Sequence, residues 1–172
     1  MAGRWRGRTL VAPAGNEVRP TADRVREAWL SVVQPDLAGA RVIDLFAGSG
    51  ALGLEALSRG ASYVDFVEQG APGLRALTRN IEALGAGDQA RVHRAEAIRY
   101  MMGLKAGAYD VAFADPPYGH GLAARVAEQW LETPFADVLG IEHGKAEEMP
   151  EGGASRRYGS TALTFYRNPE AV

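Results

Sequence analysis

The chain has 172 residues, a formal net charge of −2, 47% hydrophobic residues and 23% charged residues. This is the composition of one ordinary globular domain. The lack of cysteine excludes disulfide bonds, thiolate metal sites and a cysteine nucleophile. No apolar run approaches the roughly 20 residues that cross a bilayer, and none follows the basic N-terminus, so we expect no membrane segment and no secretory signal. We expect a monomer in the cytoplasm.

Positive charge is concentrated at the N-terminus, where residues 1–28 hold six arginines and three acidic residues. Arginine pairs with phosphate and stacks on bases better than lysine does. A GC-rich genome would also favour arginine, but it does not explain the clustering at one end. Residues 1–20 therefore predict a basic arm or hairpin. Trp5 lies between arginines and is equally suited to stacking on a base or to pinning this segment to the domain.

After this segment, helical and strand patterns alternate along residues 21–172, which we expect to form a single domain. Helices are predicted from apolar periodicity and from terminal proline and glycine. Strands are predicted from short apolar or alternating runs. The expected helices are 21–33, 51–59, 72–84, 95–105 and 122–131. The expected strands are 41–45, 63–68, 91–93, 109–114 and 138–142, with a hairpin over 156–166.

This alternation predicts an α/β fold with a mostly parallel sheet, helices on both faces and an antiparallel C-terminal hairpin at one edge. In such folds ligands bind beyond the carboxyl ends of the strands. Two strand-to-helix turns at that edge carry the residues with chemical meaning.

The first turn contains Gly48, Gly50 and Gly53, with the G-x-G-x-x-G spacing that lets a backbone approach a ligand closely. Glu68 ends the next expected strand, where an acid can bind ribose hydroxyls. These features fit a dinucleotide as well as an adenosyl ligand. Asp44, just before the glycines, would repel a pyrophosphate but not a sulfonium or an ammonium group. It therefore favours S-adenosylmethionine, although an acid that merely caps the turn is the alternative.

Glu96 follows the third expected strand. By position, its carboxylate can accept a hydrogen bond from the amino group of adenine. An acid that only stabilises the first turn of a helix is a close alternative.

The second turn, Asp115-Pro116-Pro117-Tyr118, is the most specific motif in the chain. Two prolines fix the backbone and remove two N–H donors, so acceptors face outward. The Asp115 carboxylate and the Pro116 carbonyl can hold the N–H groups of an exocyclic amine, while Tyr118 offers a ring for stacking. Such a turn can position an amine for methyl transfer and stabilise the positive charge that develops on nitrogen. Without its sequence context, this motif would indicate only a proline-rich turn.

These two turns, together with residues 3–8, residues 19–27 and Tyr158-Gly159, resemble the bacterial RsmD-type family of class I, Rossmann-like methyltransferases. The resemblance implies a seven-stranded sheet, S-adenosylmethionine as cofactor, and methylation of a guanine N2 in 16S ribosomal RNA or the assembled small subunit. By motif match it carries over Asp44, Phe46, Gly48, Gly50 and Glu68 as cofactor-site residues, and Asp115, Pro116, Pro117 and Tyr118 as the catalytic turn. It also implies that the segment with Thr21 closes over the methionine end of the cofactor. Two further assignments come from the residues themselves: Glu96 as a cofactor contact by its position, and the N-terminal cluster of Arg4, Trp5, Arg6, Arg8 and Arg24 as candidate RNA-binding residues.

Other functions share parts of this pattern. A DNA adenine-N6 methyltransferase has the same turn but usually carries an added recognition domain. A protein glutamine methyltransferase would not explain the N-terminal arginines. A protein that binds RNA and cofactor without transferring methyl, and a nicotinamide-dependent oxidoreductase, are the alternatives from other classes. His93, His120 and His143 lack ligand spacing, so we expect no metal site.

Overall fold

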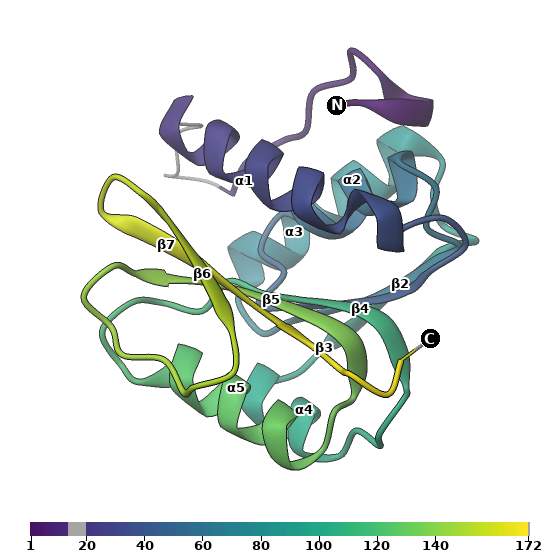
Figure 1. Cartoon of the computed structure of the whole chain (residues 1–172). Coiled ribbons are helices and arrows are strands. Elements are labelled where there is room, and N and C mark those ends of the chain that lie inside the picture. Colours follow the sequence, from purple (N-terminus) through teal and green to yellow (C-terminus); the bar gives the residue numbers. More distant parts are fainter. Residues whose placement is uncertain (14–19, 172) are drawn as a thin grey trace.

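The computed structural model describes residues 1–13 and 20–171 of the chain. Seven strands form one sheet in the order β3-β2-β1-β4-β5-β7-β6 (Figure 1). The strands are β1 (Arg41–Leu45), β2 (Tyr63–Glu68), β3 (Ala90–Arg94), β4 (Tyr109–Ala114), β5 (Ala136–Gly144), β6 (Ala154–Tyr158) and β7 (Thr161–Arg167). The helices are η1 (Gly3–Trp5), α1 (Pro20–Val33), η2 (Gln34–Asp36), α2 (Ala51–Ser58), α3 (Ala71–Leu84), α4 (Ala97–Met102) and α5 (Leu122–Glu132).

The first five strands run parallel, and β7 adds to β5 in the antiparallel sense, followed by β6. The strand order therefore reverses between β1 and β4, and the carboxyl ends of these two strands form the switch point at which ligands bind in open α/β sheets. The predicted seven-stranded, mostly parallel sheet with an antiparallel hairpin is confirmed.

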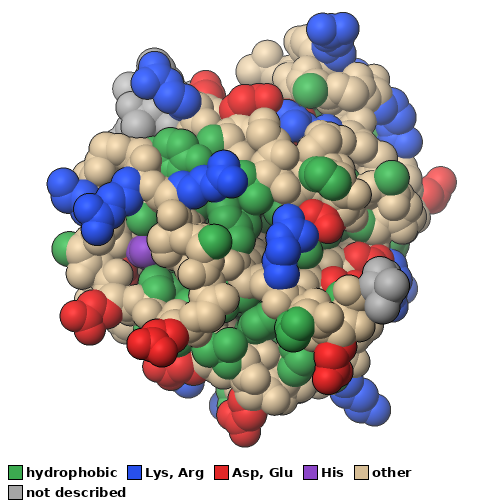
Figure 2. Space-filling model, viewed as in Figure 1, with side chains coloured by type: hydrophobic (Ala, Val, Ile, Leu, Met, Phe, Trp, Pro, Cys, Tyr) green, Lys and Arg blue, Asp and Glu red, His purple; other side chains and the backbone are tan. Residues whose placement is uncertain are grey.

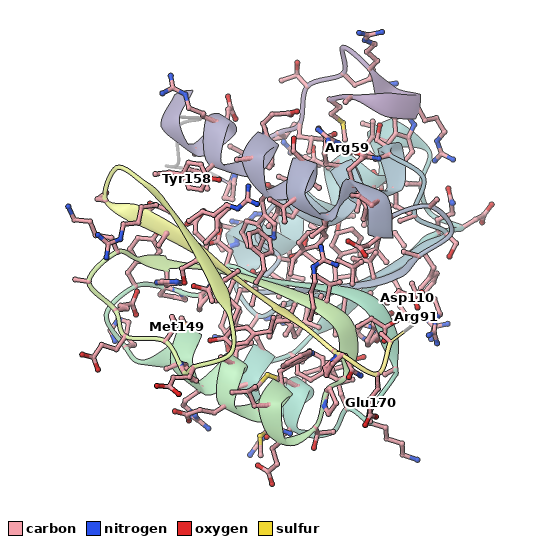
Figure 3. All side chains as sticks on the ribbon, in the orientation of Figure 1. Arg59, Arg91, Asp110, Met149, Tyr158 and Glu170 are labelled. Carbon is pink, nitrogen blue, oxygen red and sulfur yellow. The ribbon has the colours of Figure 1, made fainter. Side chains whose placement is uncertain are left out.

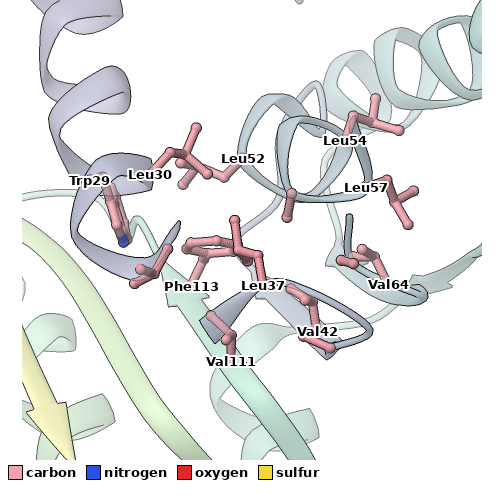
Figure 4. Packing of buried hydrophobic residues seen from close by; sticks show 14 of the residues in the cluster. Trp29, Leu30, Leu37, Val42, Leu52, Leu54, Leu57, Val64, Val111 and Phe113 are labelled. Atoms are coloured by element: carbon pink, nitrogen blue, oxygen red, sulfur yellow. The ribbon is translucent and has the colours of Figure 1, made fainter. Parts of the chain in front are cut away.

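Helices cover both faces of the sheet, as the sequence predicts. Helices α1, α2 and α3 pack on one face, and α4 and α5 on the other (Figure 1). On the first face Trp29 of α1 meets Phe113 of β4 edge-on, with ring centroids 5.6 Å apart, and leucines of α2 fill the space beside them (Figure 4). This packing fixes α1 above the carboxyl ends of β4 and β5.

Element bounds differ from the sequence expectations mainly at helix ends and edge strands. The helix expected over 95–105 is shorter, because Glu96 serves as the N-cap of α4 and Gly103 follows its last turn. The strand expected over 138–142 extends over Ala136–Gly144, since β7 pairs with it along its length. The pairing of two strands that are distant in the sequence is a tertiary effect, which the local sequence pattern does not predict.

The N-terminal segment departs from the expected hairpin within its described part, residues 1–13. It contains the single turn η1 in place of paired strands. The Trp5 N–H donates to Ser58 Oγ over 2.9 Å, and the Ser58 hydroxyl donates to the Ala2 carbonyl. Trp5 is 8% exposed and belongs to the core cluster of the first face. The segment is thus held to the end of α2 by a buried ring and by hydrogen bonds.

Candidate functional site

Four acidic side chains lie at the carboxyl edge of the sheet, at the ends of four adjacent strands. Glu68 ends β2, Asp44 lies in β1, Asp115 follows β4, and Glu142 lies near the end of β5. Because parallel strands end at the same edge, residues that are far apart in the sequence converge here. The edge is therefore rich in hydrogen-bond acceptors and in negative charge.

The glycine turn closes over the end of β1. Phe46 has a positive φ of 58°, a conformation that is costly for a side chain with a Cβ and that clusters at functional sites. Gly48 also has positive φ, and a side chain added there would meet nothing within 4 Å, so its backbone faces open space. A Cβ on Gly53, in contrast, would lie 2.4 Å from the Phe66 ring. Gly48 thus leaves room for a ligand, whereas Gly53 permits helix–sheet packing.

Two neighbouring cavities flank the turn and share Phe46 and Asp115. The larger, of about 440 Å³, lies on the β2 side, and the smaller, of about 240 Å³, lies beneath the first turns of α1. The larger is lined by Phe46, Val67, Glu68, Gln69, Ala95, Ala97, Asp115, Pro116, Pro117 and Tyr118. The smaller is lined by Ala22, Arg26, Trp29, Asp44, Phe46, Ala47, Gly48, Ser49, Ala51, Leu52, Asp115 and Glu142. Because they share two lining residues, the two cavities lie side by side, and their combined volume is in the range that drug-sized ligands occupy.

Asp44 is one of the residues that line the smaller cavity. Its side chain is 1% exposed, and Oδ2 accepts a hydrogen bond from the Gly53 N–H over 3.0 Å. Burial raises the pKa of Asp44 from 3.8 to about 8, against the opposing effect of the Gly53 hydrogen bond, and the Glu68 charge adds to the rise. A positively charged ligand above Asp44 would offset this penalty on ionisation. The capping role considered from the sequence is present, and it coexists with a place in the cavity wall.

Glu68 is fixed by two backbone donors. Its Oε1 accepts from the Gly48 N–H over 2.8 Å, and its Oε2 accepts from the Gly70 N–H over 2.7 Å. Each oxygen can accept a further hydrogen bond, and Glu68 lines the larger cavity. The carboxylate is therefore oriented in advance of any ligand, as a receptor for hydroxyl groups requires.

Glu96 has a different immediate role. Its two oxygens accept from the backbone N–H groups of Ile98 and Arg99, at 3.1 and 2.7 Å, which makes it the N-cap of α4. It is not among the side chains that line either cavity. The helix-capping alternative accounts for these contacts, and its contact with an adenine stays a prediction.

The Asp-Pro-Pro-Tyr turn lines the larger cavity, and its Asp115 also lines the smaller one. Pro116 is buried, while Asp115, Pro117 and Tyr118 are exposed at the cavity surface. Asp115 shares the smaller cavity with two other acidic residues, Asp44 and Glu142. Desolvation by the surrounding protein, followed by the charge of Glu142 and then of Asp44, raises the pKa of Asp115 well above its ordinary value. A carboxyl group of raised pKa is a better proton acceptor once it is ionised.

Tyr118 is held by residues that the sequence analysis did not single out. Its hydroxyl donates to Glu142 Oε2 over 2.7 Å and lies 2.9 Å from Thr161 Oγ1. Partial burial and the Glu142 carboxylate raise the pKa of Tyr118, so the hydroxyl is a neutral donor. The turn itself is tied to the loop after β5, since Glu147 accepts from the N–H groups of Gly119 and Gly144. Glu142 stands at a strand end, and this position was the one signal that could have identified it.

The structure separates the candidate RNA-binding residues into two places. Trp5 is buried and Arg4 covers its ring at 4.1 Å, which is the pinning role that the sequence also allowed. A contact of Trp5 with RNA stays a prediction. Arg8 donates to the Ala83 carbonyl at the end of α3, and Arg6 is exposed nearby. These residues lie near the ends of α2 and α3, helices that start at the carboxyl edge of the sheet and run away from it (Figure 1). RNA binding by Arg4, Arg6 and Arg8 stays a prediction.

Arg24 is exposed on α1, close to the carboxyl edge of the sheet. Lys and Arg side chains gather there over the start of α1 and over the β6–β7 hairpin (Figure 2). Tyr158 at the hairpin end lies beside α1, and Asp110 marks the opposite, amino edge of the sheet (Figure 3). The side chain of Thr21 and all of Arg19 lie outside the described residues.

The histidines do not cluster. His93 contacts Asp65 over 2.8 Å, and His143 is buried against Thr164. Among the residues that the structure describes, no group of three or more side chains could hold a metal ion. Within that same part of the chain, no helix has the length and apolar character needed to cross a membrane.

Comparison with known proteins gives a consistent family. Residues 1–167 match the family model described as Conserved hypothetical protein 95. The chain is 41% identical over 122 residues to ribosomal RNA small subunit methyltransferase D of Escherichia coli K12, covering 71% of this chain but only 61% of that protein. It is 32% identical to the protein of the same name from Haemophilus influenzae, over 97% of this chain and 90% of the relative.

Solved structures agree with the fold. A hypothetical protein of Thermus thermophilus, TTHA0928, superposes with a TM-score of 0.80 at 31% identity, over 97% of both chains. The 16S rRNA N2 G1207 methyltransferase RsmC of Thermus thermophilus, in complex with AdoMet and guanosine, gives a TM-score of 0.67 at 19% identity, over 90% of this chain and 44% of that one. The family predicted from the motifs is confirmed: this chain belongs to the family described as Conserved hypothetical protein 95, which groups it with the ribosomal RNA small subunit methyltransferase D proteins.

Proposed function

We propose that this chain transfers a methyl group from S-adenosylmethionine to the exocyclic N2 of a guanine in small-subunit (16S) ribosomal RNA, in the cytoplasm. Residues 21–172 would form the catalytic domain. The observation that carries the proposal is the Asp-Pro-Pro-Tyr turn at the junction of two cavities, next to the glycine turn of β1. The names of the relatives support ribosomal RNA as the substrate.

The residues at the edge fit the cofactor. Glu68 presents an oriented carboxylate suited to ribose hydroxyls, and Gly48 leaves its backbone open. Asp44 is a buried acid that gains from a cationic neighbour. The similar-fold methyltransferase RsmC is named as a complex with AdoMet, which supports this assignment. When bound, S-adenosylmethionine supplies a methyl group activated by its sulfonium.

The chain's own residues would bind, orient and deprotonate the amine. The Asp115 carboxylate and the Pro116 carbonyl accept hydrogen bonds from the two N–H groups of the amine. This arrangement directs the nitrogen lone pair toward the activated methyl group. Tyr118, fixed by Glu142 and Thr161, offers its ring to the base plane. Asp115 lowers the energy of the cationic nitrogen and takes its proton. A base within a stacked helix must be extruded to reach this turn.

Two alternatives make different predictions. A DNA adenine-N6 methyltransferase would share the turn, but the matched relatives are named for ribosomal RNA. A protein that only binds RNA and cofactor would have no use for an oriented tyrosine and a carboxyl group of raised pKa at one turn.

The test is methyl transfer to its expected substrate. Small ribosomal subunits from a strain lacking the protein are incubated with the enzyme and tritium-labelled S-adenosylmethionine, and the RNA is digested to nucleosides. We expect label in N2-methylguanosine. Asp115→Ala should lower turnover by at least about 100-fold, with cofactor affinity within a few fold of wild type. Label in methyladenosine, or full turnover by Asp115→Ala, would refute the proposal.

A further inference from the structure

Glu142 is a half-buried acid that connects the catalytic turn to two other strands. It lies near the end of β5, and its Oε2 accepts the Tyr118 hydroxyl over 2.7 Å. Thr161 at the start of β7 contacts the same hydroxyl at 2.9 Å. Tyr118 is 42% exposed, so without these two contacts little else would fix its ring.

The same side chain stands beside Asp115. Ala114 of β4 pairs with Ile141 of β5, so Asp115 and Glu142 are the next residues on two adjacent parallel strands. Both line the smaller cavity. Two carboxyl groups in neighbouring positions repel each other when both are ionised. Glu142 therefore acts on the geometry of Tyr118 and on the charge around Asp115.

We propose that Glu142 is a positioning residue for methyl transfer, which fixes the Tyr118 ring with one oxygen and strengthens Asp115 as the proton acceptor through its charge. This inference rests on the proposed function and adds a residue to its machinery. In the transfer, the new N–C bond forms as the S–C bond breaks, and one N–H proton passes to the Asp115 carboxylate.

The charge effect has a defined direction. The groups around Asp115 are Glu142 on β5, Asp44 on β1, Tyr118 in the same turn, and Arg26 of α1, which lines the same cavity and is paired with Asp23. Glu142 raises the pKa of Asp115, so its neutralisation lowers that pKa. Asp115 would then be ionised at lower pH but would be a weaker base.

Two matched variants separate the two effects. Glu142→Gln keeps an oxygen acceptor for Tyr118 but removes the charge, whereas Glu142→Leu removes the charge and the acceptor together. The measurements are the carbon-13 NMR titration of the Asp115 carboxyl group and the fluorine-19 signal of Tyr118 in fluorotyrosine-labelled protein, assigned with Tyr118→Phe. Both are made without RNA, and the pH dependence of turnover on ribosomal subunits is added.

We expect Glu142→Gln to move the Asp115 titration, and the acid limb of turnover, about one pH unit lower, with the Tyr118 signal nearly unchanged. Glu142→Leu should move the Asp115 titration in the same direction and should also broaden or shift the Tyr118 signal. A Tyr118 signal that is the same in the two variants would overturn the positioning role of Glu142. An unmoved Asp115 titration in Glu142→Gln would overturn the inference. Both NMR measurements need neither RNA nor turnover, so they test the role of Glu142 independently of methyl transfer. A wild-type protein that transfers no methyl group would refute the proposed function instead.

Discussion

Replacement of Asp44 by asparagine gives the sharpest prediction for the cofactor site. Asparagine keeps the size of the side chain and an oxygen acceptor for the Gly53 N–H, but it cannot ionise. In wild type the carboxyl group has a pKa of about 8 in the folded, ligand-free protein, against 3.8 without burial. At one unit per 1.36 kcal/mol, the folded environment, in which burial is the largest cause, therefore disfavours the ionised form by roughly 6 kcal/mol.

This shift makes cofactor binding depend on protons. At pH 7 only about one Asp44 in ten is ionised in the empty site, so a cationic ligand that stabilises the carboxylate releases nearly one proton on binding. At pH 8 the release falls to about one half. Wild-type affinity for S-adenosylmethionine should rise about tenfold per pH unit up to about pH 8. Asp44→Asn should bind more weakly at pH 8, and this proton release should disappear.

Titration calorimetry in buffers of different ionisation enthalpy measures the protons released, and the asparagine variant corrects for titration of the ligand itself. Thermal unfolding without ligand gives a second readout. The folded-state pKa of Asp44 lies above the unfolded one, so its favourable contribution is complete below about pH 4 and is lost as pH rises to about 8. Wild type should lose stability relative to Asp44→Asn over this window. Equal proton release by the two proteins would refute the reasoning.

Two further predictions concern packing and the N-terminal arginines. Gly53→Ala should destabilise the fold by about 1–3 kcal/mol in chemical denaturation, because the added methyl group would meet the ring of the β2 phenylalanine; an unchanged midpoint would mean that the helix shifts freely. Replacing Arg4, Arg6 and Arg8 by glutamine should lower the salt slope of RNA binding by about one for each lost phosphate contact, with Lys105→Gln on the amino edge as control. An unchanged slope would identify the segment as purely structural.

Site residues that lie at the carboxyl ends of strands could be predicted from the sequence. Asp44, Glu68 and Asp115 each lie at or just after a parallel strand, and the fold brings all such positions to one edge. The sequence predicts the motif glycines as one group, but the structure gives them different roles. Gly48 faces open space, whereas at Gly53 the neighbouring Phe66 ring leaves no room for a side chain. Spacing alone cannot distinguish these two reasons for a glycine.

The residues that the sequence did not identify act through tertiary contacts. Glu142 and Thr161 meet Tyr118 only because β7 returns antiparallel to β5, and neither belongs to a recognisable motif. Trp5 has the neighbours of a base-stacking residue, but its ring is buried in the core cluster of the first face, and its backbone N–H is bound by Ser58 of α2. Local pattern describes what a side chain could do, whereas packing decides which option is realised.

A crystal structure of the chain with S-adenosylhomocysteine, the demethylated cofactor, measures the geometry on which methyl transfer depends. We expect the ribose hydroxyls at Glu68, the amino-acid end above Asp44, and the sulfur directed at the space between the Asp115 carboxylate and the Tyr118 ring. A sulfur atom that points away from Asp115, with the ligand otherwise well ordered, would contradict the assignment of the Asp-Pro-Pro-Tyr turn as the place of transfer.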